Sequence, residues 1–385
     1  MSISAPGKVI LFGEHSVVYG FSALATSLDA FTTLNFRQIH SHEFPDLVFT
    51  ICFKDFSEKS IRLNAAHLDL NLRVDDISFD LRDFFLTKSR SLLLQLEYPT
   101  EVVPSVAVVL LSWYLLRVKY HEYKTAVFHH ELTFSSTLPM CSGLGSSAAY
   151  CTVVAAFFLY VYGLVSSSNP SDDDLICIQS FAHELEKVMH DSPSGVDTAI
   201  STSGGMVLFK KSTIDEETFI RPLKIRLPHC NIPKLIVIDT KMPRSTADIV
   251  KSVRQLYESQ PDLCRHIFKE IEGICEKAVD IFSAPVNSAS WNQLSKLFGQ
   301  NHQALCKLGV SNWLLDEIVR RLENIGIGAK LTGAGRGGCV IALPCSNGDS
   351  VCALEKIRSL FKDLDIFIFE VAFCVPGVRI QPPSD

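Results

Sequence analysis

The sequence contains no CxxC pair, no excess of basic residues and no P-loop, and each absence narrows its function. Its twelve cysteines are scattered over 385 residues, without the paired spacing of zinc ribbons or thiol oxidoreductases. The formal net charge of −6 gives no basic face for nucleic acid. Scattered thiols are typical of small core residues in a reducing compartment. We therefore expect a cytoplasmic protein without nucleic-acid partners.

Targeting signals are also lacking. The opening Met1–Ser4 has neither the basic start nor the long apolar core of a secretory signal. The final residues, Pro-Pro-Ser-Asp, do not form an SKL-type peroxisomal address, although a peroxisomal fraction stays open as an alternative.

Two long uncharged segments raise the question of a membrane. Ala148–Val165 reaches the lower limit of about 18 residues for a spanning helix, whereas Val102–Leu116 is shorter. The longer segment carries several tyrosines, and its flanks lack clustered Lys or Arg. We interpret both segments as buried core helices, so no membrane association is expected.

The length favours two domains, because a chain of 385 residues exceeds one typical core. The pattern changes after Gly204-Gly205, which predicts domains over residues 1–225 and 226–385. At the start we expect a strand, a Pro-Gly turn, a second strand and a third strand around Ser16–Tyr19. Ser171 and Asp174 form a capping box, which predicts a helix start.

The remaining periodicity predicts helices and strands further along the chain. Expected helices cover 102–120, 246–282 (more than one helix), 291–307, 312–324 and 349–361, and expected strands cover 125–134, 235–239, 329–331, 339–343 and 365–373.

Two glycine-rich stretches, Gly143–Ala148 and Gly333–Gly338, fit the spacing of a dinucleotide-binding loop. The first stretch does not follow a strand directly, and it lacks the acidic residue expected about 20 positions later. The second leads into a strand instead of a helix. Neither is therefore expected to bind a nicotinamide or flavin dinucleotide. The first stretch nevertheless suits phosphate binding. Its glycines leave the backbone N–H groups free to turn toward a phosphate, and the helix that follows directs its N-terminus at the same place. Ser146 and Ser147 add hydroxyls suited to a phosphate oxygen or Mg²⁺.

Several other candidate residues could have a purely structural role. His183-Glu184-Leu-Glu186-Lys187 resembles a zinc-protease motif, but Lys187 replaces the second histidine ligand. Glu186 borders the apolar face of its helix, where a carboxylate needs a structural cation or a metal ion. Taken alone, Asp197 reads as a turn or cap residue and Lys8 as a surface lysine.

Taken in order, these pieces resemble one family. APGKVILFGEHSVVYG, SGLGSSAAY, PSGVD, TKMPRST and KLTGAGRGGC follow the pattern of the kinases for galactose, homoserine, mevalonate and phosphomevalonate (the GHMP superfamily). Three of the forms, APGKVILFGEH, PSGVD and DTKMPRST, are similar to those of mevalonate kinases in particular. The resemblance covers residues 5–339.

The resemblance implies an α+β fold. It comprises an N-terminal domain of the ribosomal-protein-S5 domain-2 type and a ferredoxin-like C-terminal domain. The active site is expected between them, and the last strand is expected to return to the first domain in some members.

The resemblance also assigns residues by motif. It places the ATP-binding loop on Cys141, Ser142, Gly143, Leu144, Gly145, Ser146 and Ser147, with Ser136 and Lys8 as further ATP contacts. It implies Asp197 as catalytic base and Lys8 as the catalytic lysine that neutralises charge near the transferred group. Magnesium would be held by Ser147 and Glu186, and the acceptor alcohol by His15 and Thr246. Gly333, Ala334 and Gly335 open a third glycine loop, residues 333–338.

The implied activity is ATP-dependent phosphorylation of the primary hydroxyl of mevalonate to 5-phosphomevalonate, in the route to isoprenoids and sterols. Phosphomevalonate kinase is the nearest alternative, and its phosphorylated substrate would need extra cations such as Lys241 and Arg244. A non-catalytic ligand-sensing relative is the other alternative. The resemblance further implies a homodimer and feedback inhibition by isoprenoid diphosphates at the ATP site.

Several positions depart from the family pattern. Met140 and Cys141 stand where the family usually has proline and glycine, and Asp191-Ser192 replaces a usual Gly-Asn. Arg336 replaces a glycine of the third loop, and we expect it to be exposed rather than a phosphate contact. A nucleotide-contacting asparagine of some relatives has no clear counterpart near residues 50–56. These departures bear on nucleotide affinity.

Overall fold

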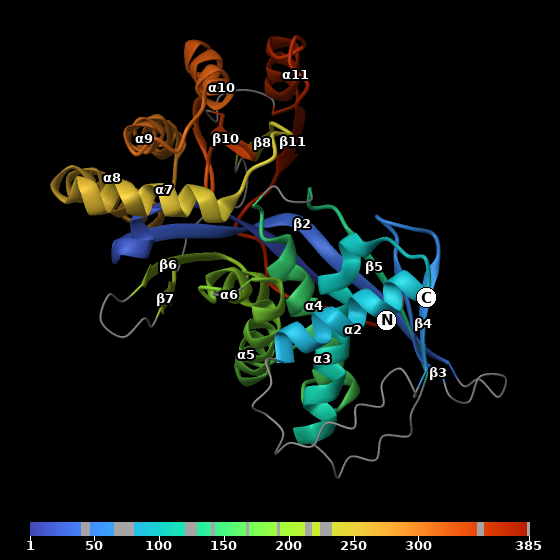
Figure 1. The fold of residues 1–385 in the computed structure, drawn as a ribbon. Coiled ribbons are helices and arrows are strands. Elements are labelled where there is room, and N and C mark those ends of the chain that lie inside the picture. Colours follow the sequence, from blue (N-terminus) through green and yellow to red (C-terminus); the bar gives the residue numbers. More distant parts are fainter. Residues whose placement is uncertain are drawn as a thin grey trace.

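The computed structural model describes residues 1–39, 47–64, 81–119, 129–139, 143–166, 169–190, 193–211, 218–223, 233–344 and 350–382. Within these ranges the chain forms two β-sheets with helices packed on them (Figure 1). The strands are β1 (Ser2–Phe12), β2 (Ser22–Ile39), β3 (Leu47–Phe53), β4 (Ser60–Asn64), β5 (His129–Ser136), β6 (Met206–Lys211), β7 (Thr218–Pro222), β8 (Leu235–Asp239), β9 (Gly328–Leu331), β10 (Cys339–Leu343), β11 (Phe367–Val371) and β12 (Arg379–Gln381).

The helices fall into two groups along the chain. The first group contains α2 (Leu81–Gln95), α3 (Val103–Lys119), α4 (Ser146–Val161), α5 (Asp172–Met189) and α6 (Val196–Ser203), with short 3₁₀ helices η1 (Ser16–Tyr19) and η3 (Thr100–Val102). The second group contains α7 (Thr246–Ser259), α8 (Pro261–Ser283), α9 (Ser288–Lys307), α10 (Trp313–Asn324) and α11 (Ser350–Leu360). Figure 1 shows α2–α6 below the long strand β2 and α7–α10 above it.

The larger sheet has the strand order β12-β1-β2-β5-β3-β4, with β6 paired to β2 and β7 to β6. Its neighbours are antiparallel except β3 and β5, which run parallel. Helices α4 and α6 pack against β1, and α8 of the second group contacts β2. The smaller sheet is antiparallel in the order β11-β8-β10-β9, and the third glycine loop connects β9 to β10.

The expected start of two strands around a Pro-Gly turn is wrong, because β1 runs unbroken from Ser2 to Phe12. The register shifts between Pro6 and Lys8, so the dipeptide makes a bulge inside the strand. At Gly7 a Cβ atom would lie 2.6 Å from the carbonyl oxygen of Leu144. Glycine is therefore needed here because the backbone of a second segment approaches closely.

The expected third strand at Ser16–Tyr19 is also wrong, since these residues form η1. The preceding His15 has φ 62° and the following Gly20 has φ 84°, so both ends turn through the left-handed region. The Ser16 hydroxyl donates to the carbonyl of Gly13. This local turn overrides the strand preference of the two valines between.

The two apolar segments both form helices. In α4 every residue from Ala148 to Leu159 is buried, which confirms the prediction of a core helix. The stretch Thr100–Arg117 is long and apolar enough to cross a membrane by composition, but 67% of it is buried inside the protein. Since α3 packs on α2, α4 and α5, this stretch is a core element as well.

Most of the other predicted elements agree with the structure. The capping box is present, because the Asp174 N–H donates to the Ser171 side chain and the Ser171 N–H donates to the Asp174 carboxylate. The strands expected at 235–239 and 339–343 match β8 and β10. The predicted strand start at 125 lies outside the described residues.

The last strand of the chain pairs with the first. Strand β12 pairs with β1, with Gln381 opposite Ser2, so both ends of the described chain lie in the larger sheet. The predicted domain boundary at 225 falls in the segment 224–232, outside the described residues. The division into 1–225 and 226–385 therefore stays a prediction.

Candidate functional site

The bulge in β1 places Lys8 against the start of α6. The Lys8 side chain is 8% exposed, and its Nζ lies 3.1 Å from Oδ2 of Asp197, which is 32% exposed. Asp197 stands in the first turn of α6, after Gly195 in the left-handed region with φ 77°. The structure thus joins residues 189 positions apart in sequence into an ion pair that still reaches solvent through Asp197.

The glycine loop packs against Lys8 of this ion pair. The backbone N–H of Lys8 donates to the carbonyl of Leu144 at 2.8 Å. Gly145 has φ 76°, and a Cβ atom there would lie 2.8 Å from Cγ of Lys8. Helix α4 begins directly afterwards at Ser146, so its N-terminus faces the region of Lys8. Cys141 and Ser142, also predicted for this loop, lie outside the described residues, whereas Gly143 lies within them.

Glu186 lies at the meeting of α4 and α5. The residue is 2% exposed, and its Oε2 has no hydrogen-bond partner among the described residues. The pKa of Glu186 is raised to about 8, mainly by burial and also by the charge of Asp197, while Lys8 partly opposes the shift. The sequence predicts that this carboxylate needs a cation beside it. Within the described residues its Oε2 has no hydrogen-bond partner, so this oxygen is free to accept one.

His190 links Ser147, which lies on α4, to the C-terminal end of α5, the helix that carries Glu186. Its Oγ lies 3.0 Å from Nε2 of His190, and the His190 N–H donates to the carbonyl of Glu186 at 2.9 Å. A hydroxyl and an unpartnered carboxylate oxygen are ligand types that Mg²⁺ prefers. The sequence did not single out His190 as a site residue, although its place one turn after Glu186, at the C-terminal end of α5, could have indicated it.

Arg244 connects the glycine loops of the two halves. Its guanidinium occupies the space that a Cβ atom would need at Gly143 and at Gly338. It also donates to the carbonyl of Gly337 at 3.2 Å. The sequence singled out Arg244 only as a cation for a phosphorylated substrate. Its contact with both loops depends on the tertiary fold.

His15 reaches the third glycine loop. Its Nε2 lies 2.8 Å from the carbonyl oxygen of Ala334, so Nε2 carries a proton and donates it. Burial lowers the pKa of His15 from the ordinary 6.5, which favours the neutral ring. Gly335 packs so closely on the carbonyl of Val310 that a side chain there would collide with it. Gly333 has φ 75° and faces Arg244.

Two further predicted residues lie apart from the ion pair. Thr246 is the exposed first residue of α7, two positions after Arg244. Ser136 ends β5, where its Oγ lies 3.2 Å from the Thr32 hydroxyl and its N–H donates to Asp55. Within the described residues neither side chain bonds to Lys8, Asp197 or Glu186.

A buried ion pair behind His15 was not anticipated. Glu14 and Lys330 are 1% and 0% exposed, and one Glu14 oxygen pairs with the Lys330 ammonium. The other oxygen accepts from the Asn301 side chain at 3.1 Å. The pair joins the end of β1 to β9, which leads into the third glycine loop.

Among the departures from the family pattern, only Arg336 can be placed. It is exposed, as expected, with φ 49°. Its Nε donates to the carbonyl of Gly309 at 3.0 Å, and its backbone N–H donates to the carbonyl of Val310. Met140, Cys141, Asp191 and Ser192 lie outside the described residues.

Comparisons with known proteins agree with this geometry. Models of the GHMP kinase N-terminal domain and of the GHMP kinase C-terminal domain match residues 109–205 and 282–363. The mevalonate kinase of Mus musculus is 30% identical over 390 residues, which cover 98% of this chain and 94% of the relative. The chain belongs to the mevalonate kinase family. Membership of this kinase family implies use of ATP.

Other members of the family match over most of their length too. The mevalonate kinase of Pyrococcus furiosus is 30% identical, with 92% of each chain covered. The solved structure of Methanococcus jannaschii mevalonate kinase matches with a TM-score of 0.70 at 25% identity, covering 99% of this chain and 98% of that one. The two-domain α+β GHMP kinase fold inferred from the motifs is confirmed.

Proposed function

We propose that this protein transfers the γ-phosphoryl group of ATP to the primary hydroxyl of mevalonate, giving 5-phosphomevalonate. The observation that carries the proposal is the Lys8–Asp197 ion pair, with 3.1 Å between Nζ and Oδ2 and the glycine loop packed against Lys8. Support also comes from full-length mevalonate kinase relatives. A solved structure of similar fold is that of L. major mevalonate kinase in complex with R-mevalonate.

Asp197 and Lys8 are assigned the chemical step. Asp197 keeps access to solvent and can therefore meet an incoming alcohol, whose proton its carboxylate accepts as the hydroxyl attacks phosphorus. Lys8 is buried, so its ammonium stabilises negative charge on the transferred group in a low dielectric. Phosphoryl transfer needs mainly positioning and charge neutralisation, which this pair supplies.

The glycine loop and α4 are assigned the phosphates of ATP. Gly143 and Gly145 both have positive φ, so backbone N–H groups can turn toward a phosphate without side chains between them. The N-terminus of α4 at Ser146 adds the favourable end of the helix dipole. Cys141, Ser142 and Ser136 keep their proposed ATP contacts as predictions.

Mg²⁺ is assigned to Ser147 and Glu186. The fit rests on the buried Oε2 of Glu186, which lacks a hydrogen bond within the described chain and is an oxygen ligand of the type that Mg²⁺ takes. When bound, the ion would neutralise charge on the phosphate oxygens of ATP. Glu186 must give up its proton to serve, and the neighbouring Lys8 favours its anion.

The acceptor site is assigned to His15 and Thr246. The His15 ring is fixed by its bond to Ala334, which holds its other nitrogen in one orientation. Thr246 starts α7 next to the Arg244 segment, which contacts both glycine loops. An alcohol bound here would lie between residues of the two halves of the chain.

The alternatives fit the geometry less well. A phosphorylated acceptor needs additional cations, but Lys241 pairs with Asp365 and Arg244 bonds to the carbonyl of Gly337. This engagement favours mevalonate over phosphomevalonate. A sensor without activity has no need for Lys8, Asp197 and Glu186 to meet at one loop.

The family resemblance predicts a homodimer and feedback inhibition by isoprenoid diphosphates, and both stay predictions. Light scattering tests the first. Inhibition of ADP release by farnesyl diphosphate, competitive with ATP, tests the second. The cytoplasmic location also stays a prediction.

The test of the proposed function is Mg²⁺-dependent ADP release with mevalonate, 5-phosphomevalonate, galactose, homoserine or no acceptor. We expect release with mevalonate alone. Release with another acceptor would keep the mechanism and change the substrate. ATP binding without release in any reaction would favour a sensor.

A further inference from the structure

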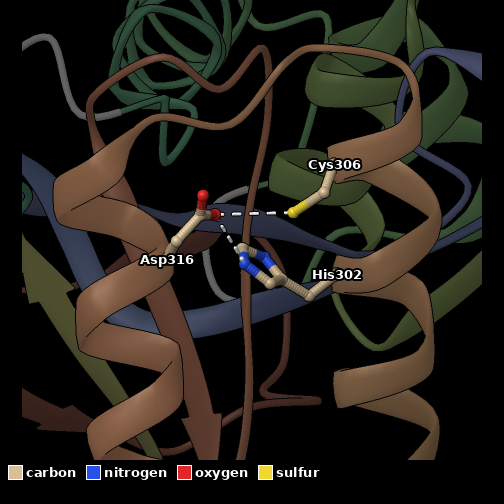
Figure 2. Close-up of side chains that lie close together, drawn as sticks. All are labelled: His302, Cys306 and Asp316. Atoms are coloured by element: carbon tan, nitrogen blue, oxygen red, sulfur yellow. Dashed lines mark hydrogen bonds and ion pairs between the residues drawn. The ribbon is translucent and has the colours of Figure 1, made fainter.

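Three polar side chains gather away from the Lys8–Asp197 pair, beside the third glycine loop. Figure 2 shows His302 and Cys306 on one helix and Asp316 on the neighbouring helix, facing each other. Nε2 of His302 lies 3.2 Å from Oδ1 of Asp316, and Sγ of Cys306 lies 3.4 Å from the same oxygen. The Ser311 hydroxyl donates to that oxygen as well. The group has the residue types and closeness of a transition-metal site.

The hydrogen bonds of His302 argue against a metal. The backbone N–H of Leu331 donates to Nδ1 of His302 at 3.3 Å. The neutral ring therefore carries its proton on Nε2 and donates it to Asp316. A metal on Nε2 would move that proton to Nδ1, where it would face the Leu331 N–H as a second donor. The Cys306 thiol is likewise engaged as a donor to Asp316, and burial together with the charge of Asp316 raises its pKa to about 12.

The network instead spans two supports of the third glycine loop. Leu331 ends β9, two residues before Gly333. Ser311 lies in the turn that follows α9, and Asp316 lies in the first turn of α10. The carbonyl of Val310 in that turn accepts from the Arg336 N–H at 2.8 Å. His302, which is 5% exposed, thus ties the strand before the loop to the turn beneath it.

We propose that His302 is a positioning residue for the loop of residues 333–338. The loop in turn supplies the Ala334 carbonyl that holds His15 and the Gly337 carbonyl that holds Arg244. His302 thereby acts on the acceptor side of the site without touching substrate. This role rests on the proposed function only in that His15 is taken to bind the acceptor.

The proposal is tested by two substitutions at one position. His302→Gln keeps an amide oxygen to accept from Leu331 and an amide N–H to donate to Asp316, so near-normal kinetics are expected. His302→Leu keeps the volume but leaves the Leu331 N–H unpaired and removes one of the donors to Asp316. We expect KM for the acceptor to rise about tenfold, the effect of one lost buried hydrogen bond, with kcat little changed.

The matched control is a second buried histidine in the other half of the chain. His129 is 9% exposed and bonds to the Thr50 hydroxyl, so His129→Leu makes the same chemical change without contact to the loop. Both leucine variants are expected to lower Tm. Only His302→Leu is expected to raise KM, and an equal rise in both variants, or no rescue by His302→Gln, would overturn the positioning role.

A readout without turnover separates this proposal from the proposed function. Hydrogen exchange of peptides covering residues 331–338 is expected to quicken in His302→Leu and to stay unchanged in His129→Leu. Unchanged exchange in His302→Leu would refute the role whatever the substrate proves to be. A Zn²⁺-dependent rise in Tm that is lost in Cys306→Ser would overturn the hydrogen-bond assignment.

Discussion

The carboxylate of Glu14 and the ammonium of Lys330 form an ion pair buried on both sides, across 316 positions of sequence. Glu14 precedes the acceptor-site candidate His15, and Lys330 lies in β9 before the third glycine loop. Because Asn301 donates to the second Glu14 oxygen, both oxygens are satisfied. The pair therefore fixes the loop relative to β1.

Removing one member of this pair should be far worse than removing both. Lys330→Met leaves the buried Glu14 charge unpaired, and we expect a loss of about 3–5 kcal/mol in the free energy of unfolding. The double variant Glu14→Gln, Lys330→Met removes both charges and should recover most of that loss. Urea denaturation measures both, and a single variant as stable as the double would contradict the account.

Asp197→Asn should keep ATP binding and lose turnover. The amide preserves the shape of the side chain but cannot accept the proton, so kcat is expected to fall about 10²–10⁴-fold. Steady-state ADP release gives kcat, and titration with a fluorescent ATP analogue gives affinity. Near-normal turnover would remove Asp197 from the base role.

Binding of Mg²⁺–ATP should strengthen as pH rises toward 8. Glu186 has a pKa of about 8, so at pH 6.5 most of the protein must release a proton before the carboxylate can bind the ion. Calorimetry in buffers of different ionisation enthalpy should detect that proton. Glu186→Gln should flatten the pH dependence, whereas Glu184→Gln, an exposed partner of Lys187 on the same helix, should not.

The same shift predicts a pH dependence of stability. Because the folded pKa of Glu186 lies above the ordinary 4.5, the folded state holds more protons between pH 4.5 and about 8. The contribution of Glu186 is therefore most favourable below pH 4.5 and falls as pH rises through that window. Glu186→Gln should remove this term and gain most over wild type near pH 8.

Gly145→Ala should damage nucleotide binding more than stability. The residue has φ 76°, and the new Cβ would lie 2.8 Å from Cγ of Lys8. Gly163→Ala is the matched control, since Gly163 has φ 68° with open space around it. Both should cost about 1 kcal/mol of backbone strain, but only Gly145→Ala should raise KM for ATP. Equal KM values would show that the loop tolerates a side chain.

The features that could be predicted correctly from the sequence are mostly those set by residues close together in the chain. The capping box at Ser171 and the buried helix α4 follow from neighbouring residues, so both were predictable. The strand expected at Ser16–Tyr19 was wrong because His15 and Gly20 take left-handed conformations that two adjacent valines do not reveal. The motifs grouped Lys8, Asp197 and Glu186 by resemblance, and the fold brings them together.

Contacts between distant segments were beyond sequence reasoning. Nothing near Arg244 indicates that its guanidinium fills the space beside Gly143 and Gly338. The pairing of Glu14 with Lys330 and the tie from His302 to Leu331 likewise arise only when β9 is placed beside α9 and the end of β1. Glu14, Arg244 and Lys330 stand within the quoted motifs, but a motif does not show which distant residue its members contact.

Transfer of one phosphoryl group to the primary hydroxyl of mevalonate can be followed by ³¹P NMR of the product. Purified protein is incubated with Mg²⁺–ATP and mevalonate, and the product spectrum is read with proton coupling. We expect a single phosphate monoester whose phosphorus couples to the protons of the terminal methylene, formed one for one with ADP and absent with Asp197→Asn. A diphosphate, an ester at another hydroxyl or no acceptor-dependent product would contradict the proposed function.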